Sequence, residues 1–124
     1  MSGERILLVD DNLPNTELVR FLLEQNGMQV QVAESALAAL ARIPSFEPQL
    51  ILMDIQMPGM DGLELTRRLK AHEATRDIVI VAFTAYAMKG DEDRMRAAGC
   101  DAYLTKPIDV QRFAEQVRAH LRPH

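Results

Sequence analysis

Five short apolar runs divide the sequence, and each is separated from the next by a segment long enough for a helix. The runs span residues 6–9, 30–33, 50–53, 78–82 and 102–104. Three of them are apolar throughout rather than alternating, which is typical of strands buried on both faces, and such strands are usually parallel. Parallel strands are joined by helical crossovers, so the spacing predicts five βα units in an α/β domain of three layers.

The intervening segments carry helix signals. Ser35 is a predicted N-cap, Gly27 stands where a left-handed C-cap is expected, and Asp109 is expected to open the fifth helix. The side chains expected to face the core from the five helices are Leu18, Phe21 and Leu22; Leu37, Leu40 and Ile43; Leu63, Leu65 and Leu69; Met95 and Ala98; and Val110, Phe113, Val117 and Leu121.

Composition narrows the class of protein. A chain of 124 residues suits one domain spanning residues 1–124, and its single Cys excludes an internal disulfide. The net charge of −4 argues against a nucleic-acid partner, which would favour a basic surface. No apolar run reaches the roughly 18 residues that a membrane span needs, and no signal-peptide core is present. We therefore expect a cytoplasmic protein with no nucleic-acid or membrane partner.

Polar residues stand where the predicted strands end, and ligands of parallel sheets bind outside the carboxyl ends of the strands. Asp10 and Asp11 follow the first run, Asp54 the third, Thr84 the fourth and Lys106 the fifth. Three carboxylates at one edge repel one another unless a cation is bound, and Mg²⁺ prefers carboxylates, water and phosphate oxygens. The pattern predicts a Mg²⁺ and phosphate site.

Asp54 differs from the other two acids because it ends a buried central run and precedes a turn-rich loop. A carboxylate held there can act as a nucleophile that forms an acyl phosphate. Phosphoryl transfer depends on positioning and charge neutralisation more than on acid–base groups, so the lack of a His at a strand end is no obstacle.

Four segments together resemble the receiver domains of two-component response regulators, the CheY-like family. They are Leu7-Leu8-Val9-Asp10-Asp11-Asn12, Leu52-Met53-Asp54-Ile55-Gln56-Met57-Pro58-Gly59-Met60-Asp61-Gly62, Phe83-Thr84-Ala85 and Tyr103-Leu104-Thr105-Lys106-Pro107. The resemblance extends over residues 5–121. It implies a doubly wound, flavodoxin-like sheet with strand order 2-1-3-4-5. Within the family, the chain is most similar to single-domain receivers of the DivK type and to receivers of hybrid histidine kinases.

The resemblance implies roles for the acidic cluster. Asp54 is the expected phosphoryl acceptor and also a Mg²⁺ ligand. Asp11 is the expected principal Mg²⁺ ligand, while Asp10 acts through water or weakly. Gln56 is expected to offer only its backbone carbonyl to the metal.

It also implies the groups that sense phosphorylation. The Thr84 hydroxyl and the Lys106 amine are expected to bind the phosphoryl group, and Tyr103 lies at the family's switch-aromatic position. For Tyr103 a second interpretation stays open, because aromatic residues favour strands in any case.

The expected function is a phosphorelay switch that takes a phosphoryl group from a phosphohistidine of a histidine kinase or phosphotransfer protein. It would be a phosphoacceptor with self-phosphorylation and autodephosphorylation activity rather than a conventional enzyme. The expected output is binding of a downstream protein at the face made by the fourth helix, fifth strand and fifth helix. The fourth helix, residues 90–98, has few core anchors, and its expected outward side chains are Asp91, Glu92, Asp93, Arg94 and Arg96.

Three alternatives remain open. The chain could be a receiver excised from a hybrid histidine kinase. A phosphohydrolase with an Asp nucleophile needs a second Asp two residues later, where Gln56 stands. A flavin carrier needs a Ser/Thr/Gly-rich loop after the first strand, where Asp10-Asp11-Asn12 stands.

Overall fold

A computed structural model of the chain describes residues 3–55, 62–84, 89–105 and 108–121. The strands are β1 (Arg5–Val9), β2 (Gln29–Ala33), β3 (Leu50–Asp54), β4 (Val79–Thr84) and β5 (Ala102–Thr105). The helices are α1 (Leu13–Gln25), α2 (Ala36–Phe46), α3 (Gly62–Ala71), α4 (Lys89–Ala98) and α5 (Phe113–Leu121).

The strands form one parallel sheet in the order β2-β1-β3-β4-β5, which confirms the predicted doubly wound α/β fold. Each apolar run became a strand, with ends shifted by at most two residues. The register pairs Asp54 of β3 with Phe83 of β4, and Thr84 of β4 with Thr105 of β5. The last residues of the three strands therefore lie at one edge, called here the carboxyl edge; the opposite one is the amino edge.

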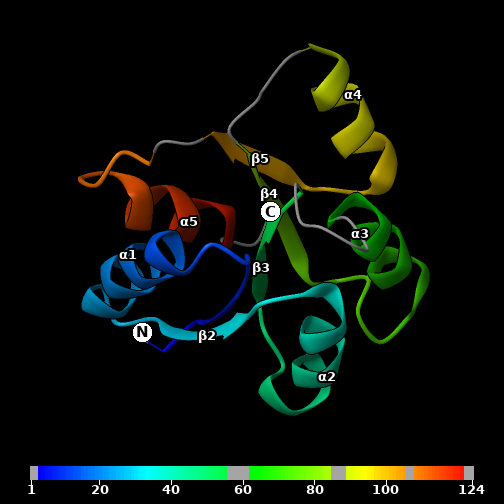
Figure 1. The fold of residues 1–124 in the computed structure, drawn as a ribbon. Coiled ribbons are helices and arrows are strands. Elements are labelled where there is room, and N and C mark those ends of the chain that lie inside the picture. Colours follow the sequence, from blue (N-terminus) through cyan, green and yellow to red (C-terminus); the bar gives the residue numbers. More distant parts are fainter. Residues whose placement is uncertain (1–2, 56–61, 85–88, 106–107, 122–124) are drawn as a thin grey trace.

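Alternate residues of each strand enter different cores, which is why the central runs are apolar throughout. Ile6 and Leu8 pack under α1 and α5, whereas Leu7 and Val9 pack under α2 and α3. A smaller cluster joins α4 to the sheet through Met95 and other buried residues. The ribbon in Figure 1 shows the result, with α1 and α5 on one face of the sheet and α2 and α3 on the other.

The predicted ends of α1 and α2 are confirmed. The Ser35 hydroxyl accepts a hydrogen bond from the Ala38 amide at 3.1 Å, so Ser35 caps α2. Gly27 has φ of +86° after α1. A side chain would be strained at this angle, which explains why a glycine ends that helix.

Two predicted helix faces were wrong in part. Leu22 of α1 and Ile43 of α2 are buried as expected. Phe21 is 59% exposed and Leu18 is also exposed, because the buried stripe of α1 passes through Thr16, Val19 and Leu23. A period of 3.6 residues places Thr16 and Val19 on one face, and the small polar Thr16 conceals this stripe from a search for apolar residues. Leu37 of α2 is also exposed, because the buried face of this helix runs through the small residues Ala36 and Ala39.

The fifth helix begins at Phe113, four residues after Asp109. The Asp109 side chain accepts a hydrogen bond from the Gln111 amide at 3.1 Å, and the Asp109 carbonyl accepts from the amides of Arg112 and Phe113. This local turn leaves Val110 56% exposed, so Val110 is not part of the buried face. In the described part of the chain, no helix has both the length and the apolar character to cross a membrane.

Candidate functional site

Three carboxylates meet at the carboxyl edge of the sheet. Asp10 follows β1, Asp54 ends the neighbouring β3, and Asp11 lies next to Asp10. One side-chain oxygen from each of the three lies within 4.8 Å of the others. Asp10 is 1% exposed and Asp54 is 4% exposed, whereas Asp11 is open to solvent. Two of the three acids are therefore shielded from water, where like charges interact more strongly.

The beginning of α1 orients Asp10. Its Oδ1 accepts a hydrogen bond from the Asn12 amide at 2.9 Å, and its Oδ2 accepts from the Asn15 side-chain amide at 2.8 Å. The Asn12 side chain in turn accepts from the Asn15 backbone amide at 3.1 Å and caps the helix. Asn15 was not among the predicted site residues. The sequence pattern that could have indicated it is an N-cap residue, Asn12, followed three positions later by a second side-chain amide.

Asp54 is positioned by the close approach of α3. A Cβ atom at Gly62 would lie 2.6 Å from the Asp54 carbonyl oxygen and 2.9 Å from the Ile55 Cα. Both contacts are with backbone, which cannot move aside as a flexible side chain can. Only glycine therefore allows α3 to start against the end of β3. Gly62 is part of the second receiver-like segment of the sequence, but no role was predicted for it.

Thr84 is the fully buried last residue of β4 and is paired with Thr105 of β5. It lies one residue beyond Phe83, the register partner of Asp54. The structure thus places Thr84 at the same edge as the acids. Gln56 and Lys106 lie outside the described residues.

Tyr103 lies on β5, paired with Ala82 of β4, and is half-buried. Its hydroxyl donates a hydrogen bond to Oε1 of Glu92 in α4. This hydrogen bond, together with burial, raises the pKa of Tyr103 above its usual value near 10. Glu92 was expected to point into solvent, but it is half-buried and faces β5.

The donor set fits a hard divalent cation. Carboxylate oxygens are the ligands that Mg²⁺ prefers, and a cation would offset the repulsion among three acids gathered at one edge. An exposed acid beside two buried ones also gives the ion an approach from water. Asp10, Asp11 and Asp54 are the residues that would hold it.

Comparison with known proteins agrees with this geometry. The model of the response regulator receiver domain matches residues 6–118. The chain is 47% identical over 116 residues to the polar-differentiation response regulator DivK of Brucella ovis, covering 94% of both chains. A CheY-like receiver domain protein from Methanospirillum hungatei is 33% identical and superposes with a TM-score of 0.85, over 97% of this chain and 94% of the other.

A further solved structure bears on the acidic cluster. It is the receiver domain of a sensor histidine kinase from Pseudomonas aeruginosa, described with a magnesium ion coordinated in its active-site cleft. It is 31% identical to this chain and superposes with a TM-score of 0.86, covering 97% of this chain and 98% of that one. From the family match, the DivK relative and these structural neighbours together, we conclude that the chain belongs to the response regulator receiver domain family.

Proposed function

We propose that this receiver is a Mg²⁺-dependent phosphorylation switch in which Asp54 accepts a phosphoryl group from a phosphohistidine. The donor would be a histidine kinase or a phosphotransfer protein. The observation that supports this most is the meeting of buried Asp54 with Asp10 and Asp11 within 4.8 Å. In this proposal, residues 1–124 form one receiver domain.

In the proposed reaction, a carboxylate oxygen of Asp54 attacks the phosphorus, and the bond between phosphorus and the imidazole nitrogen breaks. The imidazole takes up a proton and leaves as a neutral ring, and Asp54 becomes an acyl phosphate. Mg²⁺, when bound by Asp10, Asp11, Asp54 and the backbone carbonyl of Gln56, supplies the positive charge that phosphoryl transfer requires. The hydrogen bonds from Asn12 and Asn15 keep Asp10 turned toward that position.

We propose that Thr84 and Lys106 bind the phosphoryl oxygens and thereby report phosphorylation. Thr84 ends β4 one residue beyond the register partner of Asp54, so it lies at the edge of the sheet where the phosphoryl group would form. Tyr103 packs between β4 and α4 and would change position as Thr84 moves. A downstream protein would then bind the face formed by α4, β5 and α5.

An Asp-nucleophile phosphohydrolase is the alternative from another functional class. It would need an acid two residues after Asp54, where Gln56 stands. The same chemistry also suits a receiver within a hybrid histidine kinase, so the proposal concerns the domain and not its arrangement in a longer protein. The net charge of −4 favours protein partners over nucleic acid.

The test is phosphoryl labelling by acetyl phosphate or by a phosphorylated histidine phosphotransfer protein, with and without EDTA. Mass spectrometry should map the label to Asp54, and EDTA should abolish labelling. Asp54→Asn should remove the label, while Asp77→Asn, an exposed residue of the turn after α3, should keep it. Full labelling of Asp54→Asn at another residue, or labelling unaffected by EDTA, would refute the proposal.

A further inference from the structure

Helix α4 is attached to the rest of the molecule unequally along its length. Its buried side chains among the described residues, Met95 and Ala98, lie in its second half. Among the described side chains of its first half, Glu92 accepts a hydrogen bond from the Tyr103 hydroxyl. In Figure 1 the end of α4 that runs into β5 lies beside α3, and the other end points away from it. Among the described side chains, the core anchors of α4 therefore lie toward its end at Ala98.

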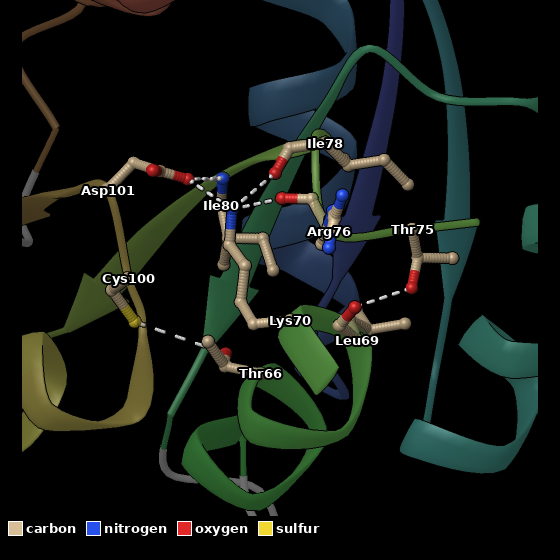
Figure 2. Close-up of polar contacts among 9 residues, drawn as sticks. All are labelled: Thr66, Leu69, Lys70, Thr75, Arg76, Ile78, Ile80, Cys100 and Asp101. Carbon is tan, nitrogen blue, oxygen red and sulfur yellow. Dashed lines mark hydrogen bonds and ion pairs between the residues drawn. The ribbon is translucent and has the colours of Figure 1, made fainter. Parts of the chain in front are cut away.

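A single ammonium group joins the turn that follows α4 to α3 and to the start of β4. Lys70, in the last turn of α3, donates to the Arg76 carbonyl at 3.0 Å, the Ile78 carbonyl at 2.9 Å and Oδ2 of Asp101 at 2.9 Å. Figure 2 shows these bonds converging between α3, the start of β4 and the turn before β5. An ammonium has three protons to donate, and all three have acceptors here.

The same carboxylate oxygen ties the turn to the sheet. Oδ2 of Asp101 also accepts from the Ile80 amide at 2.8 Å, and the Asp101 amide donates to the Ile80 carbonyl at 2.8 Å. A Cβ atom at Gly99 would lie 2.9 Å from Cγ of Lys70, so the turn packs directly on the lysine stem. The turn between α4 and β5 is therefore fixed by hydrogen bonds and by packing.

A cavity of about 230 Å³ lies between α4 and β5. It is lined by Glu92, Met95, Arg96, Cys100, Asp101, Ala102 and Tyr103, so it extends from the first half of α4 to the turn before β5. Protein interiors are otherwise close-packed, so an opening of this size leaves room for α4 to shift, and the hydrogen bonds of Lys70 and Asp101 are what restrain the turn.

We infer that Lys70 is a positioning residue that makes the turn at residues 99–101 the pivot of α4. With this pivot held, a rearrangement at the carboxyl edge moves the half of α4 that carries Glu92 and leaves the end at Ala98 in place. The inference rests on the proposed function, in which phosphorylation of Asp54 changes the α4 face. The inference adds that the half of α4 carrying Glu92 moves and that Lys70 confines the movement to that half.

The first test uses the unphosphorylated protein and amide hydrogen exchange. Lys70→Met keeps the aliphatic stem but removes the three charged hydrogen bonds. It should speed exchange at Ile80, Cys100 and Asp101 by at least about tenfold, since such bonds are among the stronger ones in proteins. The matched control is Arg67→Met on the same helix, whose ion pair with Glu64 is exposed, and it should leave these amides unchanged.

Asp101→Asn provides a second variant that keeps an acceptor for the Ile80 amide but removes the charge facing Lys70. Hydrogen exchange should again become faster at the amides of Cys100 and of residue 101. The inference therefore stays testable if Lys70→Met fails to fold. Unchanged exchange in both variants, or an equal rise in Arg67→Met, would overturn the assignment of Lys70.

The second test adds beryllofluoride, a phosphoryl mimic, in the presence of Mg²⁺. In the wild type, exchange should change in the part of α4 around Glu92 but not over residues 98–101. In Lys70→Met the change should extend through residues 98–101. Binding at Asp54 with changes along the whole of α4 in the wild type would overturn the pivot. Absence of binding at Asp54 would refute the proposed function instead, and the first test would still decide the role of Lys70.

Discussion

The two edges of the sheet are built on opposite electrostatic principles. At the carboxyl edge, Asp10, Asp11 and Asp54 bring like charges together. At the amino edge, opposite charges are paired. Arg118 binds Glu4 at 2.9 Å and also donates to the Asn26 carbonyl at 2.7 Å.

Two further contacts of the amino edge also pair a cationic side chain with an anionic or carbonyl acceptor. Lys70 binds Asp101 at 2.9 Å, and the Arg5 side chain donates to the Glu47 carbonyl at 2.7 Å. Opposite charges that pair stabilise the fold, whereas like charges brought together call for a compensating partner. The comparison teaches that charge pairing stabilises the amino edge, while the proposed chemistry lies at the carboxyl edge. Substitutions at the two edges should therefore have different consequences.

The largest effect is expected at the carboxyl edge from Gly62→Ala. Alanine normally stabilises a helix relative to glycine by up to about 1 kcal/mol. Here the added Cβ would collide with the Asp54 carbonyl oxygen at 2.6 Å, so we expect a loss of about 3 kcal/mol in the free energy of unfolding. Urea denaturation measures it, and labelling of Asp54 should fall too. A gain in stability would show that α3 does not depend on this approach.

The next largest effect is also at the carboxyl edge, and it is on Mg²⁺ affinity rather than on stability. Asn15→Ala removes the donor to Oδ2 of Asp10 and should weaken Mg²⁺ binding about tenfold, as loss of a group that orients a metal ligand commonly does. Calorimetric titration with Mg²⁺ measures the affinity. The matched control is Gln25→Ala, an exposed position at the end of α1. Equal affinity in Asn15→Ala and wild type would contradict the orienting role.

A smaller effect is expected from the charge pair of the amino edge. The hydrogen bond from Arg118 lowers the pKa of Glu4 below its usual 4.5. A carboxyl group with a depressed folded pKa contributes stability above its unfolded pKa and loses it as the pH falls through the folded value. Arg118→Met should therefore cost about 1 kcal/mol at pH 7 and progressively less below pH 4.5.

The measurement for this pair is urea unfolding of wild type and Arg118→Met across the acidic range. Arg112→Met, an exposed arginine of the turn before α5, is the control and should leave the pH dependence unaltered. A stability difference that does not shrink at low pH would mean that packing of the Arg118 stem, rather than the charge pair, is responsible.

The smallest effect is a gain at the amino edge. Glu47 ends α2 with φ of +52°, an angle that favours glycine over other residues. Glu47→Gly should raise the thermal midpoint, corresponding to about 0.5–1 kcal/mol. Glu34→Gly is the comparison, since Glu34 is not among the described residues with positive φ, and it should lower the midpoint slightly. A fall in both variants would show that the Glu47 side chain outweighs its backbone strain.

The sequence predicted the strands and the acidic cluster because both depend on local pattern. A run such as Leu50–Asp54 is apolar up to its last residue because both of its faces are covered, and the charged residue that ends it marks the carboxyl edge of the sheet. Parallel topology then brings Asp10, Asp54 and Thr84 to one edge without further information. The resemblance to receiver domains added strand order, which the periodicity alone left open.

Helix faces were predicted less well, because the buried stripe of a short helix depends on what lies opposite. Leu18, Phe21 and Leu37 are apolar but exposed, and Thr16 is polar but buried. An apolar residue therefore indicates the inner face only when its neighbours at helical spacing agree. The orientation of α1 and α2 was set by their contacts with the sheet.

The contacts that hold the amino edge join residues far apart in the chain, and only the tertiary structure decided them. Lys70 meets Asp101 across 31 residues, and Arg118 meets Glu4 across 114. Gly62 is needed because α3 returns directly against the end of β3. Local pattern determined which residues are strands and which acids end them, since burial and turn chemistry act over a few residues. The partners of long side chains and the space around a Cβ depend on how the helices pack on the sheet, which no local pattern encodes.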